Sequence, residues 1–292
     1  MKEMQYFSEE FSAEVVKQQY GNCKDIRLKT IMESAITHLH EFVKEVEPTQ
    51  EEWMYMIEYL TKTGQKCDDK RQEFILLSDV LGISALVDTI NNRKTLNATE
   101  STVLGPFHVK NAPIKDMGDN INYDGKGEPA YIFGSVTDTD GNPIDGAAID
   151  VWQANDDGFY DIQQPGVQPE MNLRGIFSTK DDGKYWFKSV KPKFYSIPTD
   201  GPVGTMINAT GRHPNRPAHL HYIVSAEGYK TVVTHVFVKG SEYLDSDAVF
   251  GVKSSLISEY ILIEDDIKAK KIGFDTPYYE LEFNFVLEKI TM

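Results

Sequence analysis

The chain has few cysteines, a deficit of positive charge and no long apolar stretches. Only two cysteines occur among its 292 residues, which excludes a disulfide-rich scaffold and a cysteine-based zinc ribbon. Asp and Glu number 45 against 30 Lys and Arg, a net charge of −15, and such a surface repels nucleic acid and anionic lipid. The apolar runs are far shorter than a membrane span, and no apolar signal region follows Met1. We therefore expect a soluble, cytoplasmic protein that contacts neither nucleic acid nor membrane.

The first third of the sequence has the periodicity of amphipathic helices. Apolar residues recur every three or four positions over residues 28–46, which predicts a helix of about five turns. Thr49 and Glu52 have the spacing of a capping box that starts a second helix. A further apolar segment, residues 71–90, is interrupted by Gly82, which predicts two shorter helices.

From residue 130 onwards the apolar period becomes two, which indicates strands separated by turns rich in Gly, Asp and Pro. The expected strands span residues 130–136, 147–152, 184–188, 219–224, 231–238 and 279–287. Many short strands of this kind favour a β-sandwich. The expected fold is therefore mainly β with a helical N-terminal part, divided into a helical domain at 1–105 and a β-sandwich domain at 106–292.

The best candidate for metal binding in the strand region is the doublet His219-Leu220-His221. Side chains two apart in a strand point to the same face, so both imidazoles can reach one ion while Leu220 faces the other way. A chance surface doublet is the alternative. The same spacing at His38 and His40 lies in a helical segment, where residues two apart do not share a face.

Two tyrosines and an arginine lie in segments that add to this doublet. Tyr160 ends the polar stretch Asn-Asp-Asp-Gly-Phe-Tyr, and Tyr195 lies in Phe-Tyr-Ser-Ile-Pro. Arg216 precedes Pro217, which restricts the arginine to an extended backbone and would keep its guanidinium beside the histidines. By position alone both tyrosines are also ordinary amphipathic surface residues.

Six segments, in order along the chain, together resemble the intradiol, ring-cleaving catechol dioxygenases, which use non-haem iron(III). They are Thr102-Val-Leu-Gly-Pro-Phe107, Asp150-Val-Trp-Gln-Ala154, Asp157-Gly-Phe-Tyr-Asp161, Leu173-Arg-Gly175, Lys193-Phe-Tyr-Ser-Ile-Pro198 and Arg216-Pro-Ala-His-Leu-His221. The resemblance covers most of the chain. It implies a β-sandwich catalytic core and a helical N-terminal dimerisation domain.

The resemblance also implies a ligand set: one iron(III) per subunit held by Tyr160, Tyr195, His219 and His221. Phenolate oxygen is a hard anionic donor that suits iron(III). As catalytic residues the resemblance implies Tyr195, which leaves the metal when the substrate binds and accepts a substrate proton, and Arg216, which stabilises developing negative charge.

Within the family, the segments 231–238 and 243–252 are most similar to the hydroxyquinol 1,2-dioxygenase subgroup. His235 stands where catechol-specific relatives usually carry Gln. The resemblance implies that a small aromatic diol, hydroxyquinol, is cleaved with O2 to 3-hydroxymuconate, the enol form of maleylacetate, in the catabolism of aromatic compounds. Cleavage of catechol or chlorocatechol to the corresponding muconate is the alternative. A non-catalytic metal- or carbohydrate-binding sandwich is a remote one.

The substrate pocket is expected to draw on both parts of the chain. Its candidate residues are Leu76, Asp79, Val103, Leu104, Gly105, Pro106, Phe107, Ile197, Pro198 and Val249. Asp79 is the only acid among them, and it either accepts a hydrogen bond from a third substrate hydroxyl or caps the following helix. The resemblance further implies a homodimer formed through the N-terminal helices, with phospholipid at the interface. The wide apolar arc of residues 28–46 provides a surface for such an interface. The alternative is that Phe11, Val15 and the C-terminal strand cover this arc within one chain.

Overall fold

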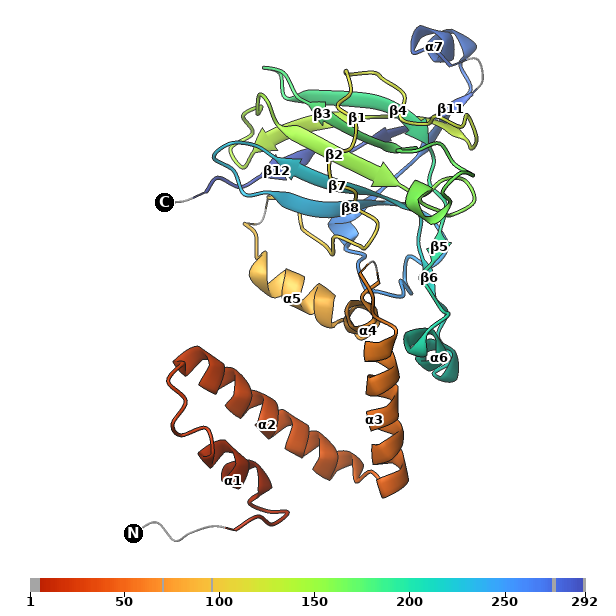
Figure 1. Ribbon diagram of the computed structural model, residues 1–292. Helices are drawn as coiled ribbons and strands as arrows, with labels where there is room; N and C mark the ends of the chain where they lie inside the picture. Colours follow the sequence, from red (N-terminus) through yellow and green to blue (C-terminus); the bar gives the residue numbers. More distant parts are fainter. Residues whose placement is uncertain (1–5, 70, 96, 275–276, 291–292) are drawn as a thin grey trace. The chain divides into compact units, whose positions relative to one another are not determined.

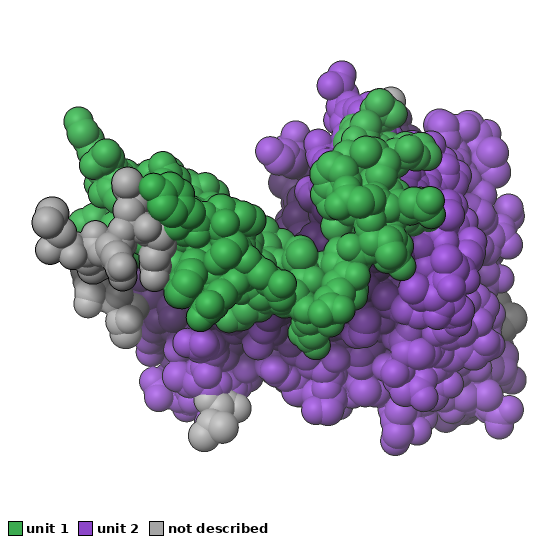
Figure 2. Space-filling view, turned by 90° about the horizontal axis from the view of Figure 1, so that it is seen from below, with its two compact units in different colours: residues 1–65 green, residues 66–292 purple. Residues whose placement is uncertain are grey.

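The computed structural model describes residues 6–69, 71–95, 97–274 and 277–290 (Figure 1). The chain forms two compact units, residues 1–65 and residues 66–292, which Figure 2 shows in different colours. None of the helices in the described ranges has both the length and the apolar character needed to span a bilayer.

The N-terminal unit consists of helices α1 (Ser12–Gln18), α2 (Ile26–Val46) and α3 (Gln50–Gln65). The expected capping box begins α3. The Thr49 backbone N–H donates to the Glu52 carboxylate at 2.8 Å, and the Glu52 N–H donates to the Thr49 hydroxyl at 3.2 Å. The seven-residue α1 was not predicted, because a helix of two turns is too short to show a periodic apolar face.

The larger unit begins with two helices, α4 (Glu73–Val80) and α5 (Ile83–Asn91). Gly82 separates them with a φ of +72°, which glycine adopts without steric cost, so the predicted interruption is confirmed. Helices α6 (Pro202–Ala209) and α7 (Asp266–Lys271) were not predicted. The first turn of α6 is stabilised from a distant part of the chain, because the buried Glu73 carboxylate accepts a hydrogen bond from the Val203 N–H.

The rest of this unit is built on two five-stranded sheets. The first contains β1 (Pro129–Asp138), β4 (Lys184–Val190), β10 (Ile261–Ile263), β11 (Tyr278–Glu282) and β12 (Phe285–Leu287). The second has the order β3-β2-β7-β8-β9, with β3 (Arg174–Ser178), β2 (Ala148–Gln153), β7 (His219–Ser225), β8 (Val232–Val238) and β9 (Ile257–Ser258). A short ladder joins β5 (Tyr195–Ser196) to β6 (Asn215–Arg216).

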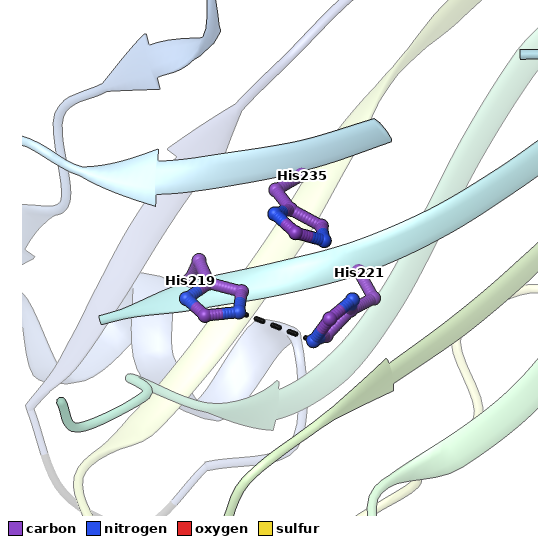
Figure 3. Close-up of side chains that lie close together, drawn as sticks. All are labelled: His219, His221 and His235. Carbon is purple, nitrogen blue, oxygen red and sulfur yellow. Dashed lines mark hydrogen bonds between the residues drawn. The ribbon is translucent and has the colours of Figure 1, made fainter. Parts of the chain in front are cut away.

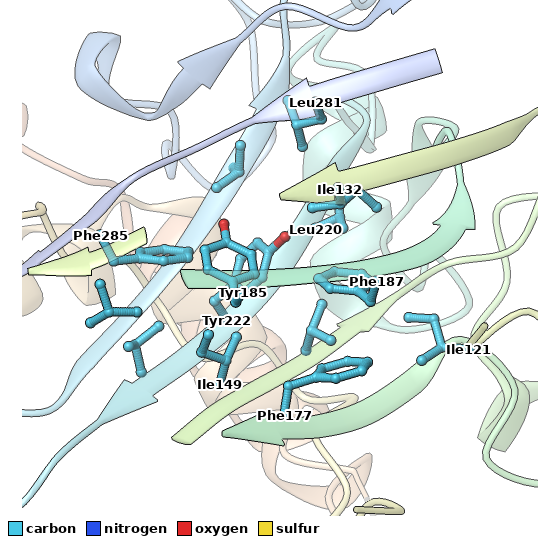
Figure 4. Packing of buried hydrophobic residues seen from close by; sticks show 14 of the residues in the cluster. Ile121, Ile132, Ile149, Phe177, Tyr185, Phe187, Leu220, Tyr222, Leu281 and Phe285 are labelled. Atoms are coloured by element: carbon cyan, nitrogen blue, oxygen red, sulfur yellow. The ribbon is translucent and has the colours of Figure 1, made fainter. Parts of the chain in front are cut away.

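The inner faces of the two sheets share one apolar core (Figure 4). Phe177 of β3 stacks on Phe187 of β4 at 4.9 Å between ring centroids, and Tyr222 of β7 meets Phe285 of β12 at 5.0 Å. Leu220 and Tyr222 are fully buried in this core. Burial of apolar surface stabilises the fold by about 25 cal/mol per Å², and it fixes which face of β7 points inward. The predicted fold class, mainly β with N-terminal helices, is confirmed.

The expected strand at 279–287 is a single segment in sequence, but the structure divides it into β11 and β12. Both follow β1 in the same parallel register. At the interruption the Asn284 side chain replaces the backbone as acceptor, receiving the Ser135 N–H at 2.9 Å. A Cβ on Gly134 would collide with the Phe283 carbonyl, so the backbones approach closely here. The compact units divide after residue 65, and the boundary at residue 105 stays a prediction.

Candidate active site and metal centre

The outer face of the second sheet carries the histidines. Trp152 of β2, His221 of β7 and His235 of β8 are register partners, so they lie side by side across three strands. His219 lies two residues before His221 and points the same way (Figure 3). The three imidazoles are buried, and each offers a nitrogen within 4.8 Å of the others. The chain therefore has a buried cluster of metal-ligating side chains.

The two predicted tyrosines reach the same place from separate segments, Tyr160 from the loop after β2 and Tyr195 from β5. Tyr160 Oη lies 2.7 Å from His221 Nε2, and the Tyr160 and Tyr195 rings meet edge to face at 5.4 Å between centroids. Tyr195 Oη accepts a hydrogen bond from Arg216 Nη1 at 3.3 Å. The structure thus brings Tyr160, Tyr195, His219 and His221 together beside Arg216.

Local contacts hold each tyrosine in place. Tyr160 follows β2 and precedes the 3-10 turn η1 (Asp161–Gln163), where its N–H donates to the Gln163 side chain at 2.9 Å. The next residue, Asp161, forms a buried ion pair with Arg174 at 2.6 Å. Tyr195 is on β5, directly opposite Arg216 on β6. An ion pair and a two-residue ladder therefore position both phenol groups.

The hydrogen bonds of His219 define its tautomer. A carbonyl only accepts, so the 2.7 Å contact with the Pro217 carbonyl places the proton on Nδ1. The lone pair of His219 Nε2 then faces inward, 3.1 Å from His221 Nε2. A backbone carbonyl that holds the distal nitrogen of a ring is the usual support of a metal-ligating histidine.

Burial keeps the side chains of His219, His221 and Tyr160 neutral when no cation is bound. Burial, aided by the Arg216 charge, lowers the pKa of His219 to about 3, and burial beside His219 lowers the pKa of His221 well below its ordinary value. Burial next to Tyr195 raises the pKa of Tyr160 well above its ordinary value. Neutral imidazoles are ready ligands, whereas the Tyr160 phenol needs a cation to drive off its proton.

A linker, residues 102–107, covers the cluster. The backbones of Val103 and Leu104 contact the His235 and His221 rings. Gly105 has a φ of +78°, and a Cβ there would lie 3.0 Å from His221 Cε1. Phe107 stacks on Tyr160 at 4.6 Å between centroids. The linker therefore presses on two ligand candidates, and only glycine fits against His221.

Comparison with known proteins places this geometry in a family. The family models described as "Dioxygenase" and "Catechol dioxygenase N terminus" match residues 103–289 and 25–99. A hydroxyquinol 1,2-dioxygenase of a Rhizobium species is 57% identical, covering 97% of each chain. The crystal structure of hydroxyquinol 1,2-dioxygenase from Pseudomonas putida has a TM-score of 0.91 at 46% identity, covering 97% of this chain and 99% of that one. Catechol 1,2-dioxygenase of Acinetobacter radioresistens has a TM-score of 0.84 at 29% identity, covering 99% of this chain and 95% of that one.

The chain belongs to the intradiol ring-cleavage dioxygenases. The predicted family and enzyme class are confirmed, and a non-catalytic binding module is excluded. The buried histidine cluster is consistent with the metal site of such an enzyme.

Most of the candidate pocket residues of this intradiol dioxygenase lie in one region of the larger unit. Ile197 and Val249 are buried in an apolar cluster against which Leu76 and Val103 pack. Gly105 and Phe107 contact the metal-site candidates as described above, whereas Leu104 is 43% exposed. Pro106 lies between Gly105 and Phe107, and Pro198 follows Ile197. The structure thus gathers four of the apolar candidates in one cluster: Leu76, Val103, Ile197 and Val249.

Asp79 does not cap the following helix. The N-cap of α5 is Gly82, and no side chain caps it. The Asp79 carboxyl instead interacts with the Ser84 hydroxyl and with the Arg216 charge, while burial raises its pKa above the ordinary value. The capping alternative is therefore wrong, and Asp79 remains a pocket candidate in the dioxygenase.

Sequence reasoning missed two groups around the dioxygenase site. Asp247 forms a buried ion pair with Arg216 at 3.0 Å, although it lies 31 residues further along the chain. Trp152 stacks on His221 at 4.8 Å with nearly parallel rings. The tryptophan was signalled by its motif, but its contact depends on strand register, and nothing in the local sequence marks Asp247.

Replacing Gly105 should weaken metal binding by the dioxygenase. In Gly105→Ala the new methyl group lies against His221, and altering the surroundings that orient a metal ligand commonly lowers metal affinity by about 10–100-fold. Gly125→Ala is the control, because Gly125 has a similar φ of +69° and a Cβ there would have no neighbour within 4 Å. The control therefore introduces the backbone strain without a contact to a ligand candidate. Chelator competition measures the affinities, and equal affinities for the two variants would contradict the expectation.

Proposed function

We propose that the chain cleaves hydroxyquinol, 1,2,4-trihydroxybenzene, with O2 between its adjacent hydroxyl-bearing carbons, giving 3-hydroxy-cis,cis-muconate. The observation that carries the proposal is the convergence of two phenol oxygens and two imidazole nitrogens beside one buried arginine. The hydroxyquinol relatives at 57% and 46% identity support this substrate over catechol, because catechol 1,2-dioxygenases of Candida albicans and Acinetobacter radioresistens are 37% and 29% identical.

Iron(III) is the metal that this donor set fits. Tyr160, Tyr195, His219 and His221 would hold it, one ion per chain, with hard phenolate donors compensating its charge. His235 lies in the same histidine cluster but is not among the four proposed ligands; its Nδ1 accepts a hydrogen bond from the Arg216 guanidinium at 3.3 Å. When bound, iron(III) would draw electron density from the chelated diol and make its ring carbons reactive toward O2.

Arg216 and Tyr195 are the proposed catalytic residues. Arg216 Nη1 lies 3.3 Å from both Tyr195 Oη and His219 Nε2, so one fixed cationic donor faces the place where substrate oxygens gather. Preorganised donors of this kind stabilise negative charge that develops during a reaction. Tyr195 Oη, held by the same donor, is positioned to accept a proton from a substrate hydroxyl.

The pocket candidates supply shape and one polar contact. Leu76, Val103, Ile197 and Val249 form an apolar wall, which suits a flat aromatic ring. Asp79 offers a carboxyl group to the third hydroxyl of hydroxyquinol. Leu104, Gly105, Pro106, Phe107 and Pro198 complete the proposed lining.

The iron proposal predicts colour. Protein expressed with iron should contain about one iron per chain and absorb visible light, because phenolate bound to iron(III) is red-brown. Tyr160→Phe should lose a clear part of the absorption, because only the Tyr195 phenolate would then remain. The control is Tyr222→Phe, because Tyr222 is equally buried but faces the opposite side of β7. A colourless iron-loaded protein, or an unchanged spectrum in Tyr160→Phe, would refute the ligand set.

The substrate proposal predicts a ranking of kcat/KM measured by oxygen uptake. Hydroxyquinol should exceed catechol, and bulky 3-substituted catechols should be poorer still. Asp79→Asn should reduce the ratio of kcat/KM for hydroxyquinol to kcat/KM for catechol, because an amide is a weaker hydrogen-bond acceptor than a carboxylate. A catechol preference of more than tenfold, about 1.4 kcal/mol in transition-state free energy, would assign the enzyme to the catechol alternative.

We also propose that residues 1–105 serve dimerisation and as a linker, while residues 106–292 form the catalytic domain. No residue of α2 is buried, and several of its apolar side chains are exposed, among them Leu39 at 58% and Phe42 at 47%. An apolar face of this length favours a two-fold interface, and it suits the tails of a bound phospholipid. Neither cysteine forms a disulfide, in keeping with a cytoplasmic enzyme.

The dimer proposal predicts twice the chain mass of 33.1 kDa in light scattering at micromolar concentration. Leu39→Asp should shift the mass toward the monomer, because it buries a charge in the apolar interface. Ser34→Asp, an exposed polar position on the same helix, should not. Circular dichroism checks that both variants remain helical, and a monomeric wild-type protein would contradict the proposal.

A further inference from the structure

Every nitrogen of the Arg216 guanidinium has a defined acceptor. Nε donates to Asp247 Oδ1 at 3.0 Å, and Nη2 donates to Asp247 Oδ2 at 3.2 Å and to His235 Nδ1 at 3.3 Å. Nη1 faces the proposed metal ligands and lies 3.3 Å from both Tyr195 Oη and His219 Nε2. Arg216 is 3% exposed and Asp247 4%, so this pairing is shielded from water.

Asp247 is itself held by the backbone of its own loop. Its Oδ1 accepts the Val249 N–H at 3.3 Å, and its Oδ2 accepts the Gly251 N–H at 2.9 Å. A Cβ on Gly251 would lie 2.8 Å from Arg216 Nη2 and 3.2 Å from Asp247 Oδ2. The backbone of this loop therefore lies against the Arg216–Asp247 ion pair at Gly251, where a side chain would not fit.

This arrangement determines where Nη1 points. A guanidinium is planar, and a carboxylate that binds its Nε and Nη2 edge fixes both the position and the tilt of that plane. Nε and Nη2 are both held by Asp247, and Nη2 also donates to His235. The direction in which Nη1 points is then fixed. Without the carboxylate, the flexible arginine side chain loses this constraint, and a buried charge loses its partner.

We propose that Asp247 is a positioning residue that aims Arg216 at the reacting oxygens. This inference rests on the proposed function, in which Arg216 stabilises charge on the substrate. Asp247 acts through the arginine, with His235 as an additional acceptor on Nη2. It contributes no proton and no metal ligand.

The first test is Asp247→Asn in the iron-loaded enzyme. We expect kcat with hydroxyquinol to fall about 100-fold, the scale for a misplaced or lost charge-stabilising donor, with iron content unchanged. Asp138→Asn, a buried aspartate paired with Lys289, is the control and should retain the wild-type kcat. Retention of more than a third of kcat by folded Asp247→Asn would overturn the proposal.

A double-mutant cycle separates positioning from a general structural role. In an Arg216→Gln background, adding Asp247→Asn should change kcat less than threefold, because the residue it acts through is gone. A further 100-fold loss there would mean that Asp247 acts independently of Arg216. Gly251→Ala is a second variant that keeps both Arg216 and Asp247. Its methyl group would lie against both side chains, so kcat should fall here as well.

The metal-free protein gives a readout that does not depend on turnover. The Nε–H of Arg216 should exchange slowly with solvent in NMR spectra, and Asp247→Asn should accelerate that exchange at least tenfold. Arg174 Nε–H, which donates to Asp161 at 2.8 Å, is the internal reference and should not change. Unchanged Arg216 exchange would overturn the positioning role. A wild-type enzyme that leaves hydroxyquinol intact would overturn the proposed function alone.

Discussion

The site depends on the register in which β7 pairs with β2 and β8. Leu220 and Tyr222 are fixed in the sandwich core, so His219 and His221 must occupy the opposite face of the strand. The same register places Trp152 and His235 on either side of His221. A slip of one residue would place both histidines in the apolar core and an apolar pair at the site. Packing of the apolar core therefore determines which polar side chains lie on the outer face of the second sheet.

Burial then gives the cluster its chemical character. Water-exposed histidines and tyrosines would titrate near their ordinary pKa values, but here the imidazole pKa values are lowered and that of Tyr160 is raised. His219, His221 and Tyr160 are therefore uncharged, and the charge of Arg216 is balanced by Asp247. Although burial alone would lower the pKa of Arg216, the nearby Asp247 carboxylate raises it. An entering cation therefore meets neutral imidazoles with free lone pairs and the Tyr160 phenol, whose proton is released to solvent on binding, while the Arg216 charge is already paired.

Much of this was readable from the sequence, because the signals are local. The capping box at Thr49, the break at Gly82 and the alternation at His219–Leu220–His221 each depend on neighbours within a few residues. The features that were missed depend on distant partners. Helix α6 starts against Glu73, the strand at 279–287 breaks where Asn284 meets Ser135, and Arg216 pairs with Asp247. None of these has a local pattern, since each is created when separate segments pack together.

The linker at 102–107 shows how a segment without regular structure gains a defined position. Its Thr102 N–H donates to the Val233 carbonyl of β8 at 2.9 Å, and the Thr102 hydroxyl donates to the Gly251 carbonyl. Gly251 is also the residue whose N–H holds Asp247. One end of the linker is therefore tied to the loop that orients Arg216, and Gly105 lies against His221. A displacement of this linker would disturb the arginine and a ligand candidate together, so the two sides of the site share one support.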